Sequence, residues 1–282
     1  MRKLTLIACL IMFCWVILIN ASDINLNAAA EGRAGASMTG TGGLFATGGN
    51  SAGLGFGKNV VVVMTYSREL LGMNKTEISG IIPLYAGVIE LVGEYGGFGE
   101  ISNPGAEDSV FSMYDLMTGA GYGIKLTDII SVGVGLYVKN NFIAGDSSYG
   151  VRLDASAMYS EKGLSASVVV KDIIKSAVTV AGIGKVFVIN NENEIKGEVT
   201  AGLGGEEEMY VCIGAEYLWN KTIAARCGYR VEKESINGLS AGAGIKFSAA
   251  GTKMNIDYAV SPKVFFENDT ELVHKVSFGI QF

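Results

Sequence analysis

The chain has 282 residues, of which 49 % are hydrophobic, 18 % are charged and 39 are glycine. The high apolar content and low charge exclude a disordered protein, and the lack of a three-residue glycine period excludes collagen. A formal charge of −6, without any run of Lys or Arg, argues against a nucleic-acid-binding protein.

The first 22 residues have the layout of a secretory signal peptide. The basic start Met1-Arg2-Lys3 is followed by an apolar run, Leu4–Ile19, and then by small residues. The alternative is a permanent membrane anchor, because this run approaches the roughly 17 to 20 apolar residues that span a bilayer. We expect residues 1–22 to be a signal peptide that directs export of the remaining chain.

Strict alternation of apolar with glycine or polar residues indicates β-strands from about residue 59 onward. In 275–282, for example, Val, Phe and Ile alternate with Lys, Ser, Gly and Gln. The alternation predicts strands at 59–67, 76–82, 86–101, 112–125, 129–142, 148–160, 163–171, 177–188, 193–202, 208–218, 222–232, 238–248, 252–260 and 271–282.

The number of strands and the lengths of their connections favour one architecture. The connections alternate between short ones, such as 126–128 and 161–162, and longer ones, such as 102–111 and 261–270. Outer-membrane barrels have an even number of strands, short periplasmic turns and longer outer loops. We therefore predict an all-β protein, a transmembrane antiparallel barrel of about 14 strands over 59–282. A soluble β-sandwich or β-helix is the alternative.

Short motifs spread along this region resemble the PorV/PorQ family of outer-membrane barrels, which is related to the FadL-type fatty acid transporters. The resemblance covers nearly all of the exported chain and depends on the order of the pieces. These are Gly121–Lys125, Ser131–Leu136, Leu153–Ser156, Val168–Asp172, Gly214–Tyr217, Arg226–Tyr229, Ala241–Gly244, Ile256–Ala259 and His274–Phe282.

The resemblance also gives a meaning to the glycine-rich segment 23–58. The family carries an Asn-Pro-Ala-Gly-Leu motif before its first strand, which is expected to fold toward the lumen. Here the motif residues Asn50, Ser51, Ala52 and Gly53 occupy that place, with serine instead of proline. The resemblance therefore implies a lumen segment, and it also implies that Phe282, a terminal aromatic residue, is a signal for the outer-membrane assembly machinery.

Charged residues on the polar faces of the predicted strands would point into the barrel. Both signs occur, so these residues can pair with one another, and Glu216 and Arg226 are expected to meet across adjacent strands. They either keep the interior solvated or line a solute path. The candidates for lining the lumen are Glu90, Lys139, Arg152, Asp154, Glu216, Arg226, Arg230, Lys246 and Asp257.

No arrangement of residues predicts an enzyme. The single histidine, His274, shares a face with Val276, whereas Ser277 points to the other face, which excludes a Ser–His pair there. Cys212 and Cys227 are expected on opposite faces of neighbouring strands, and no metal-ligand spacing occurs. We expect no catalytic residues, no metal site and no cofactor.

The resemblance implies two functions for such a barrel. The first is export or surface delivery of proteins, as a shuttle or scaffold of the type IX secretion kind. The alternative is FadL-like uptake of small hydrophobic solutes. The expected location is the outer membrane of a Gram-negative-type bacterium, with outer-membrane lipid, the assembly machinery, and either secreted cargo proteins or hydrophobic small molecules as partners, and without nucleic acid.

Overall fold

The computed structural model describes residues 27–41, 49–69, 73–102, 110–143, 145–204, 209–232, 238–249, 251–266 and 269–282. The expected signal peptide, 1–22, lies outside the described residues. In the described part, no helix is both long enough and apolar enough to cross a membrane.

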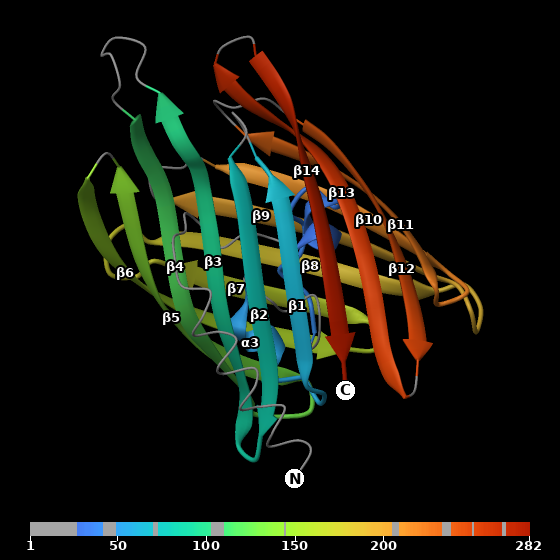
Figure 1. The fold of residues 1–282 in the computed structure, drawn as a ribbon. Helices are drawn as coiled ribbons and strands as arrows, with labels where there is room; N and C mark the ends of the chain where they lie inside the picture. The colour runs from blue at the N-terminus through green and yellow to red at the C-terminus, as the bar shows by residue number, and fades with distance from the viewer. Residues whose placement is uncertain are drawn as a thin grey trace.

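The strands form one closed antiparallel barrel, in which each strand pairs with its neighbours in the sequence and the first pairs with the last. Figure 1 shows β1, in cyan, beside β14, in red. The predicted 14-stranded antiparallel barrel is therefore confirmed. The strands are β1 Val61–Arg68, β2 Asn74–Leu84, β3 Gly87–Ser102, β4 Val110–Lys125, β5 Ile130–Ile143, β6 Asp146–Glu161, β7 Leu164–Lys171, β8 Val178–Val188, β9 Glu194–Gly204, β10 Tyr210–Trp219, β11 Ile223–Glu232, β12 Gly238–Ala249, β13 Thr252–Phe266 and β14 Asp269–Gln281.

The predicted boundaries differ from the observed ones most at β13. The alternation predicted its end at residue 260, but the strand continues to Phe266 and pairs with the start of β14. Pro262 lies in this extension. Proline lacks the N–H that a strand interior normally donates, so a proline in the sequence favours the end of a strand. In the structure Pro262 is directly opposite Leu272, and the strand passes through it.

The two faces of the wall differ as the alternation predicted. On β5, for example, Val134, Leu136 and Val138 are exposed on the outward face, whereas Gly135 and Tyr137 between them are buried. Apolar outward residues suit contact with lipid chains, and the inward residues need partners inside the barrel.

Two short turns show how the chain reverses between paired strands. Lys162 and Gly163, between β6 and β7, have φ values of 50° and 77°, and Asn220 and Lys221, between β10 and β11, have 48° and 51°. Two successive residues in this conformation match the right-handed twist of paired strands. These tight turns lie at the end of the barrel that, by the loop-length rule, faces the periplasm.

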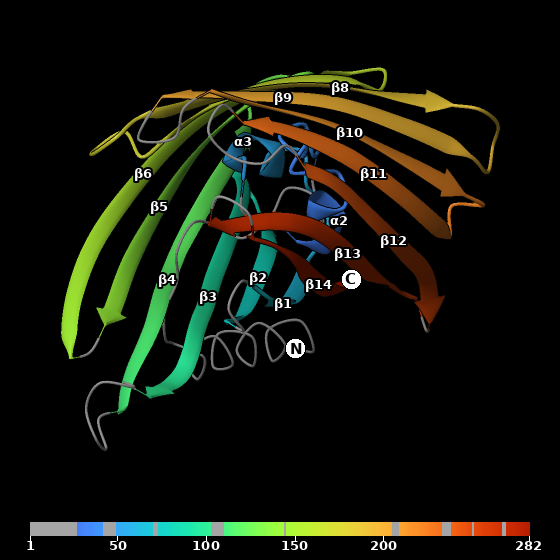
Figure 2. The same ribbon diagram turned by 90° about the horizontal axis from the view of Figure 1, so that it is seen from above.

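The described parts of the N-terminal segment, residues 27–41 and 49–60, lie inside the barrel rather than on its surface, as Figure 2 shows from above. They contain two one-turn helices, α2 (Ala28–Glu31) and α3 (Ser51–Leu54), and nearly all of the residues in these helices are buried. The helix α2 contacts β12, β13 and β14, and α3 contacts β3, β4, β5 and β6. The segment therefore reaches opposite parts of the wall.

A charge on the lipid-facing side should destabilise the barrel. Phe278 faces outward on β14, midway between Gln281 and His274. We expect Phe278→Lys to lower the free energy of unfolding by about 2–4 kcal/mol, the cost of a basic side chain near the bilayer midplane. Phe278→Leu, which removes the ring but stays apolar, serves as the control. Urea unfolding in phospholipid vesicles measures both, and equal losses for Lys and Leu would contradict the orientation of this face.

Candidate functional site: the barrel interior

The inward glycines of the strands are the points where the N-terminal segment touches the wall. A Cβ on Gly228 or Gly214 would overlap the backbone of Arg33, and a Cβ on Gly133 would overlap the backbone of Ser51. By contrast, Gly197, which faces outward on β9, has open space around it. The inward glycines thus allow a second layer of backbone to pack directly on the sheet.

The predicted motif residues form helix α3 and its start. Asn50 precedes the helix, and its side-chain oxygen accepts the N–H of Ala52 at 3.1 Å. Ser51 is the first helical residue, a position where proline is also well suited, so either serine or proline there is compatible with the helix. The Asn50 amide also donates to the carbonyl oxygen of Met38 at 2.7 Å, which joins the two described parts of the segment.

Hydrogen bonds tie α3 to the wall. The hydroxyl of Ser131 on β5 donates to the Ala52 carbonyl at 2.5 Å, and the Ala52 N–H donates to the hydroxyl of Ser156 on β6 at 2.8 Å. The small polar residues on this inward face therefore satisfy backbone groups that a buried one-turn helix would leave without partners.

At the other end, the segment is held by buried charges. The Lys275 ammonium on β14 lies 2.9 Å from a carboxylate oxygen of Glu31, whose other oxygen accepts from Ser261 at 2.5 Å. The Ala28 N–H donates to the Ser277 hydroxyl at 2.7 Å. Since Lys275 is 1 % exposed, this pair has little access to water and binds α2 to β13 and β14.

Glu198 on β9 binds the middle of the N-terminal segment through Arg33 and Thr39. Its carboxylate pairs with the Arg33 guanidinium at 3.2 Å and accepts the Thr39 N–H at 2.7 Å. Lys196 on the same strand adds a second cation at 3.1 Å. Charge-assisted bonds of this kind are stronger than neutral ones, so Glu198 is a principal anchor of the segment.

Arg226 on β11 is the centre of an ion-pair network that joins β10, β11 and β13. It lies directly opposite Glu216, as predicted, with 2.5 Å between Nε and the carboxylate. Its Nη1 lies 2.6 Å from Asp257, which also accepts a hydrogen bond from the Asn255 amide. All four side chains are buried, so Arg226 shares its positive charge between two carboxylates away from water.

Two further arginines stack on tyrosines of the neighbouring strand. Arg152 on β6 lies 5.3 Å from the ring centre of Tyr137 on β5 and forms a two-pronged pair with Asp154. Arg230 on β11 lies 4.4 Å from the ring of Tyr210 on β10 and pairs with Glu232 at 3.0 Å. The same unit of arginine, acid and tyrosine thus occurs twice on the inner wall.

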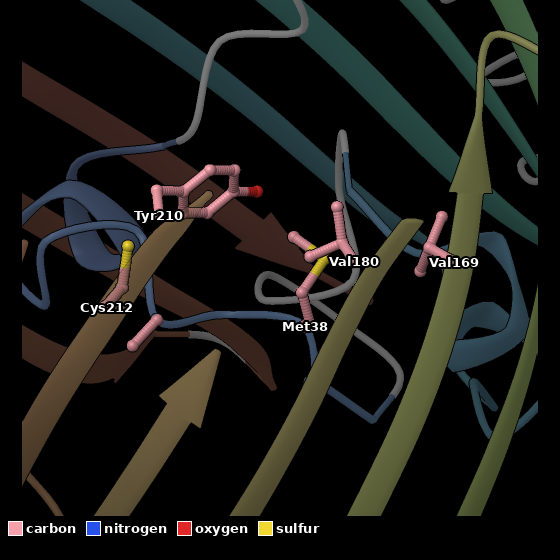
Figure 3. Packing of buried hydrophobic residues seen from close by; sticks show 6 residues of the cluster. Met38, Val169, Val180, Tyr210 and Cys212 are labelled. Atoms are coloured by element: carbon pink, nitrogen blue, oxygen red, sulfur yellow. The ribbon is translucent and has the colours of Figure 1, made fainter. Parts of the chain in front are cut away.

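Apolar side chains form patches beside these units. Met38 of the N-terminal segment packs with Val169, Val180, Tyr210 and Cys212 from strands β7, β8 and β10, as Figure 3 shows. On another part of the wall, Val92, Met117 and Tyr137 form a second buried cluster. The interior is therefore polar at the anchors of the segment and apolar in these two clusters and in a third one around Leu54 of α3.

The wall itself is interrupted between β6 and β7. Their pairing runs from Glu161↔Leu164 to Ala155↔Val170, so residues 146–154 of β6 have no strand partner on that side in the described structure. Here the Asp154 carboxylate accepts the Asp172 N–H at 3.0 Å, and the Leu153 carbonyl accepts the Ile173 N–H. Arg152 and Asp154 thus lie where the wall pairing ends.

The nine predicted lumen candidates lie on inward faces. Glu90, Arg152, Asp154, Glu216, Arg226 and Asp257 are buried, and Lys139, Arg230 and Lys246 are partly buried. The structure brings Glu216, Arg226 and Asp257 together, and separately Arg152 and Asp154.

Several charged residues that hold the segment are not among the residues predicted to line the lumen. Lys275 could have been found from its alternation with Val276 and Phe278. Glu31 and Arg33 gave no signal, because they lie in a glycine-rich stretch without periodicity. On β2, Glu77 is fully buried opposite Glu94, which pairs with Lys75 at 3.1 Å.

The two cysteines lie on opposite faces of the wall, and so do the histidine and Ser277. Cys212 is buried on the inward face and Cys227 is exposed on the outward face. His274 is exposed and Ser277 is buried, so they occupy different faces. The Phe282 N–H donates to the Val60 carbonyl at 2.9 Å, at the periplasmic end of the β1–β14 pairing. Among the described residues, no group of three or more potential metal ligands occurs.

No protein-family profile and no curated protein matches the chain. Solved structures with the same fold include the "CymD monoaromatic hydrocarbon channel", with a TM-score of 0.64 and 10 % identity over 92 % of this chain and 97 % of that one. The Pseudomonas putida toluene transporter TodX gives 0.61 and 9 % identity over 92 % and 99 %. A Pseudomonas aeruginosa FadL homologue gives 0.59 and 10 % identity over 94 % and 98 %. These similarities show the fold of an outer-membrane barrel.

The close packing of Gly228 on Arg33 gives a test of the segment's position. We expect Gly228→Ala to push the segment off the wall and make the peptide bond after Arg33, which is buried at 1 % exposure, accessible to trypsin. Gly197→Ala, with open space around its position, should leave Arg33 protected. Mass spectrometry of the digests distinguishes the variants, and equal protection in both would contradict the packing.

The Arg226 network gives a second test. Arg226→Met leaves Glu216 and Asp257 buried without their cation, and breaking such a buried pair costs about 3–5 kcal/mol. Lys125→Met, which breaks the ion pair of an exposed turn with Asp128, should cost much less. The temperature at which the folded barrel loses its distinct mobility on a gel measures both, and an equal decrease would argue against the network.

Proposed function

We propose that this protein is an outer-membrane channel for small hydrophobic solutes. The observation that carries the proposal is the barrel interior, in which polar contacts anchor an N-terminal segment and apolar clusters line the wall, one of them packed against Met38 of that segment. A water-filled general porin has a polar interior, whereas buried apolar patches favour solutes with little water around them. The similarity in fold to channels named for monoaromatic hydrocarbons and toluene supports the same proposal.

The interruption between β6 and β7 supplies an exit from the interior in this proposal. A hydrophobic solute that leaves through the wall enters the lipid directly and avoids water. Arg152 and Asp154 border this place, so we assign them, among the lumen candidates, to the path of the solute. Among the other candidates, Glu216, Arg226 and Asp257 serve to hold β10, β11 and β13 together.

Uptake measurements test the proposal. Cells that express the barrel should accumulate a labelled aromatic hydrocarbon faster than cells without it, and uptake of a hydrophilic sugar of similar size should not change. Val180→Asn places an amide in the apolar cluster and should reduce hydrocarbon uptake severalfold. Thr179→Asn, on the neighbouring outward-facing residue, is the matched control and should transport normally.

Equal uptake of both solutes would make the protein a general porin instead. Equal rates for Val180→Asn and the control, at equal amounts of folded barrel, would show that the cluster is not on the path.

Protein export is the second candidate, and the firm anchoring of the segment favours it. Ion pairs and hydrogen bonds hold the segment at both ends, which suits a closed barrel that acts through its outer surface. Isolation in mild detergent followed by mass spectrometry separates the two candidates. Co-purifying secreted proteins would support a shuttle or scaffold, whereas bound apolar molecules without protein partners would support the channel.

A further inference from the structure

The outward face of the wall carries very few charges. Among the strand side chains that the structure describes, the charged ones on this face are Arg68, Glu161 and Lys185. Glu161 and Lys185 lie next to the turn at 162–163, at the periplasmic end, where Lys185 donates to the Lys162 carbonyl at 3.1 Å. Arg68 is separate from both, at the opposite end of the barrel.

The depth of Arg68 follows from its position in the strand. It is the eighth and last residue of β1, counted from the periplasmic end at Val61. A tilted strand crosses a bilayer in about 9 to 11 residues. The outward residues below it, Val62, Met64 and Tyr66, are apolar or aromatic. Arg68 therefore lies where the lipid-facing surface reaches the outer headgroup region.

The neighbours of Arg68 on both sides are polar and are held by tyrosines. Arg68 is directly opposite Asn74 on β2 and His274 on β14. The Tyr66 hydroxyl donates to the Asn74 side-chain oxygen at 2.6 Å, and the Tyr258 hydroxyl lies 2.7 Å from Nδ1 of His274. Tyrosines are enriched at the membrane–water interface because their rings are apolar and their hydroxyls polar.

Arg68 differs from the arginines of the interior in having no protein anion. Its side chain makes no ion pair, hydrogen bond or ring contact within the described structure, whereas Arg33, Arg152 and Arg226 each pair with a buried carboxylate. A guanidinium is always charged, and at the edge of the hydrocarbon region it extends to the headgroup layer, where an anion can pair with it. The anions available at that depth are lipid phosphates.

We propose that Arg68, Asn74 and His274 bind the phosphate of an outer-leaflet lipid headgroup. The guanidinium is suited to donate two parallel hydrogen bonds to phosphate oxygens. With its oxygen accepting from Tyr66, Asn74 retains its amide N–H groups as donors. When Tyr258 donates to Nδ1 of His274, the proton of that ring is on Nε2 and is available to the same phosphate. The three residues thus form a row of donors across β2, β1 and β14.

Native mass spectrometry of the full barrel in detergent tests this site, with lipid A, which carries two phosphates, as the probe. We expect Arg68→Gln to weaken lipid A binding about fivefold, the effect of one basic residue beside an anionic lipid. Lys185→Gln, which removes an outward-facing cation at the periplasmic end, is the matched control and should bind as the wild type does. Monophosphoryl lipid A should bind the wild type more weakly than lipid A does.

Three results would overturn the proposal. These are unchanged binding by Arg68→Gln, an equal decrease in Lys185→Gln, or equal binding of lipid A and a neutral lipid with the same acyl chains. Retention of the heat-dependent gel mobility by each variant shows that the barrel is folded. Because Arg68 faces away from the interior, hydrocarbon uptake by Arg68→Gln should be unchanged, so this site and the proposed channel succeed or fail independently.

Discussion

The pairing of β1 with β14 is the constraint on which the rest of the structure depends. Eight residue pairs, from Val61↔Gln281 to Arg68↔His274, join the two ends of the sheet. In hydrocarbon an unpaired strand edge would leave a row of N–H and C=O groups without hydrogen bonds, at several kcal/mol for each group. Closure removes these edges, and it also decides which face of every strand is enclosed.

Closure creates an interior, and that interior must be filled or solvated. In this protein residues 27–41 and 49–60 enter it and pack on inward glycines so closely that Gly133 and Gly228 have no room for a side chain. The strands supply serines for the backbone of the segment and Glu198 and Lys275 for its charges. The composition of the inner wall therefore reflects the segment as much as the barrel.

The same closure separates two kinds of arginine. Inside, Arg226 has carboxylates from β10 and β13 within ion-pair distance, because it is enclosed and cannot reach water. Outside, Arg68 lies at the closing pair itself, where β14 brings His274 beside it from the far end of the sequence. The interior thus contains the anchored segment and the proposed solute path, while the outward face of the β1–β14 pair contacts the lipid.

The sequence by itself determined the barrel, its strand number, the two faces of each strand and the pair of Glu216 and Arg226. These follow from local alternation and from neighbouring strands, because residues directly opposite in a hairpin are fixed by the turn between them. It did not determine the contacts of Glu31 and Arg33, or the meeting of Arg68 with His274. These join residues far apart in the chain, and only closure of the barrel and entry of the segment bring them together. Local periodicity carries no information about such contacts, so the tertiary structure alone decided them.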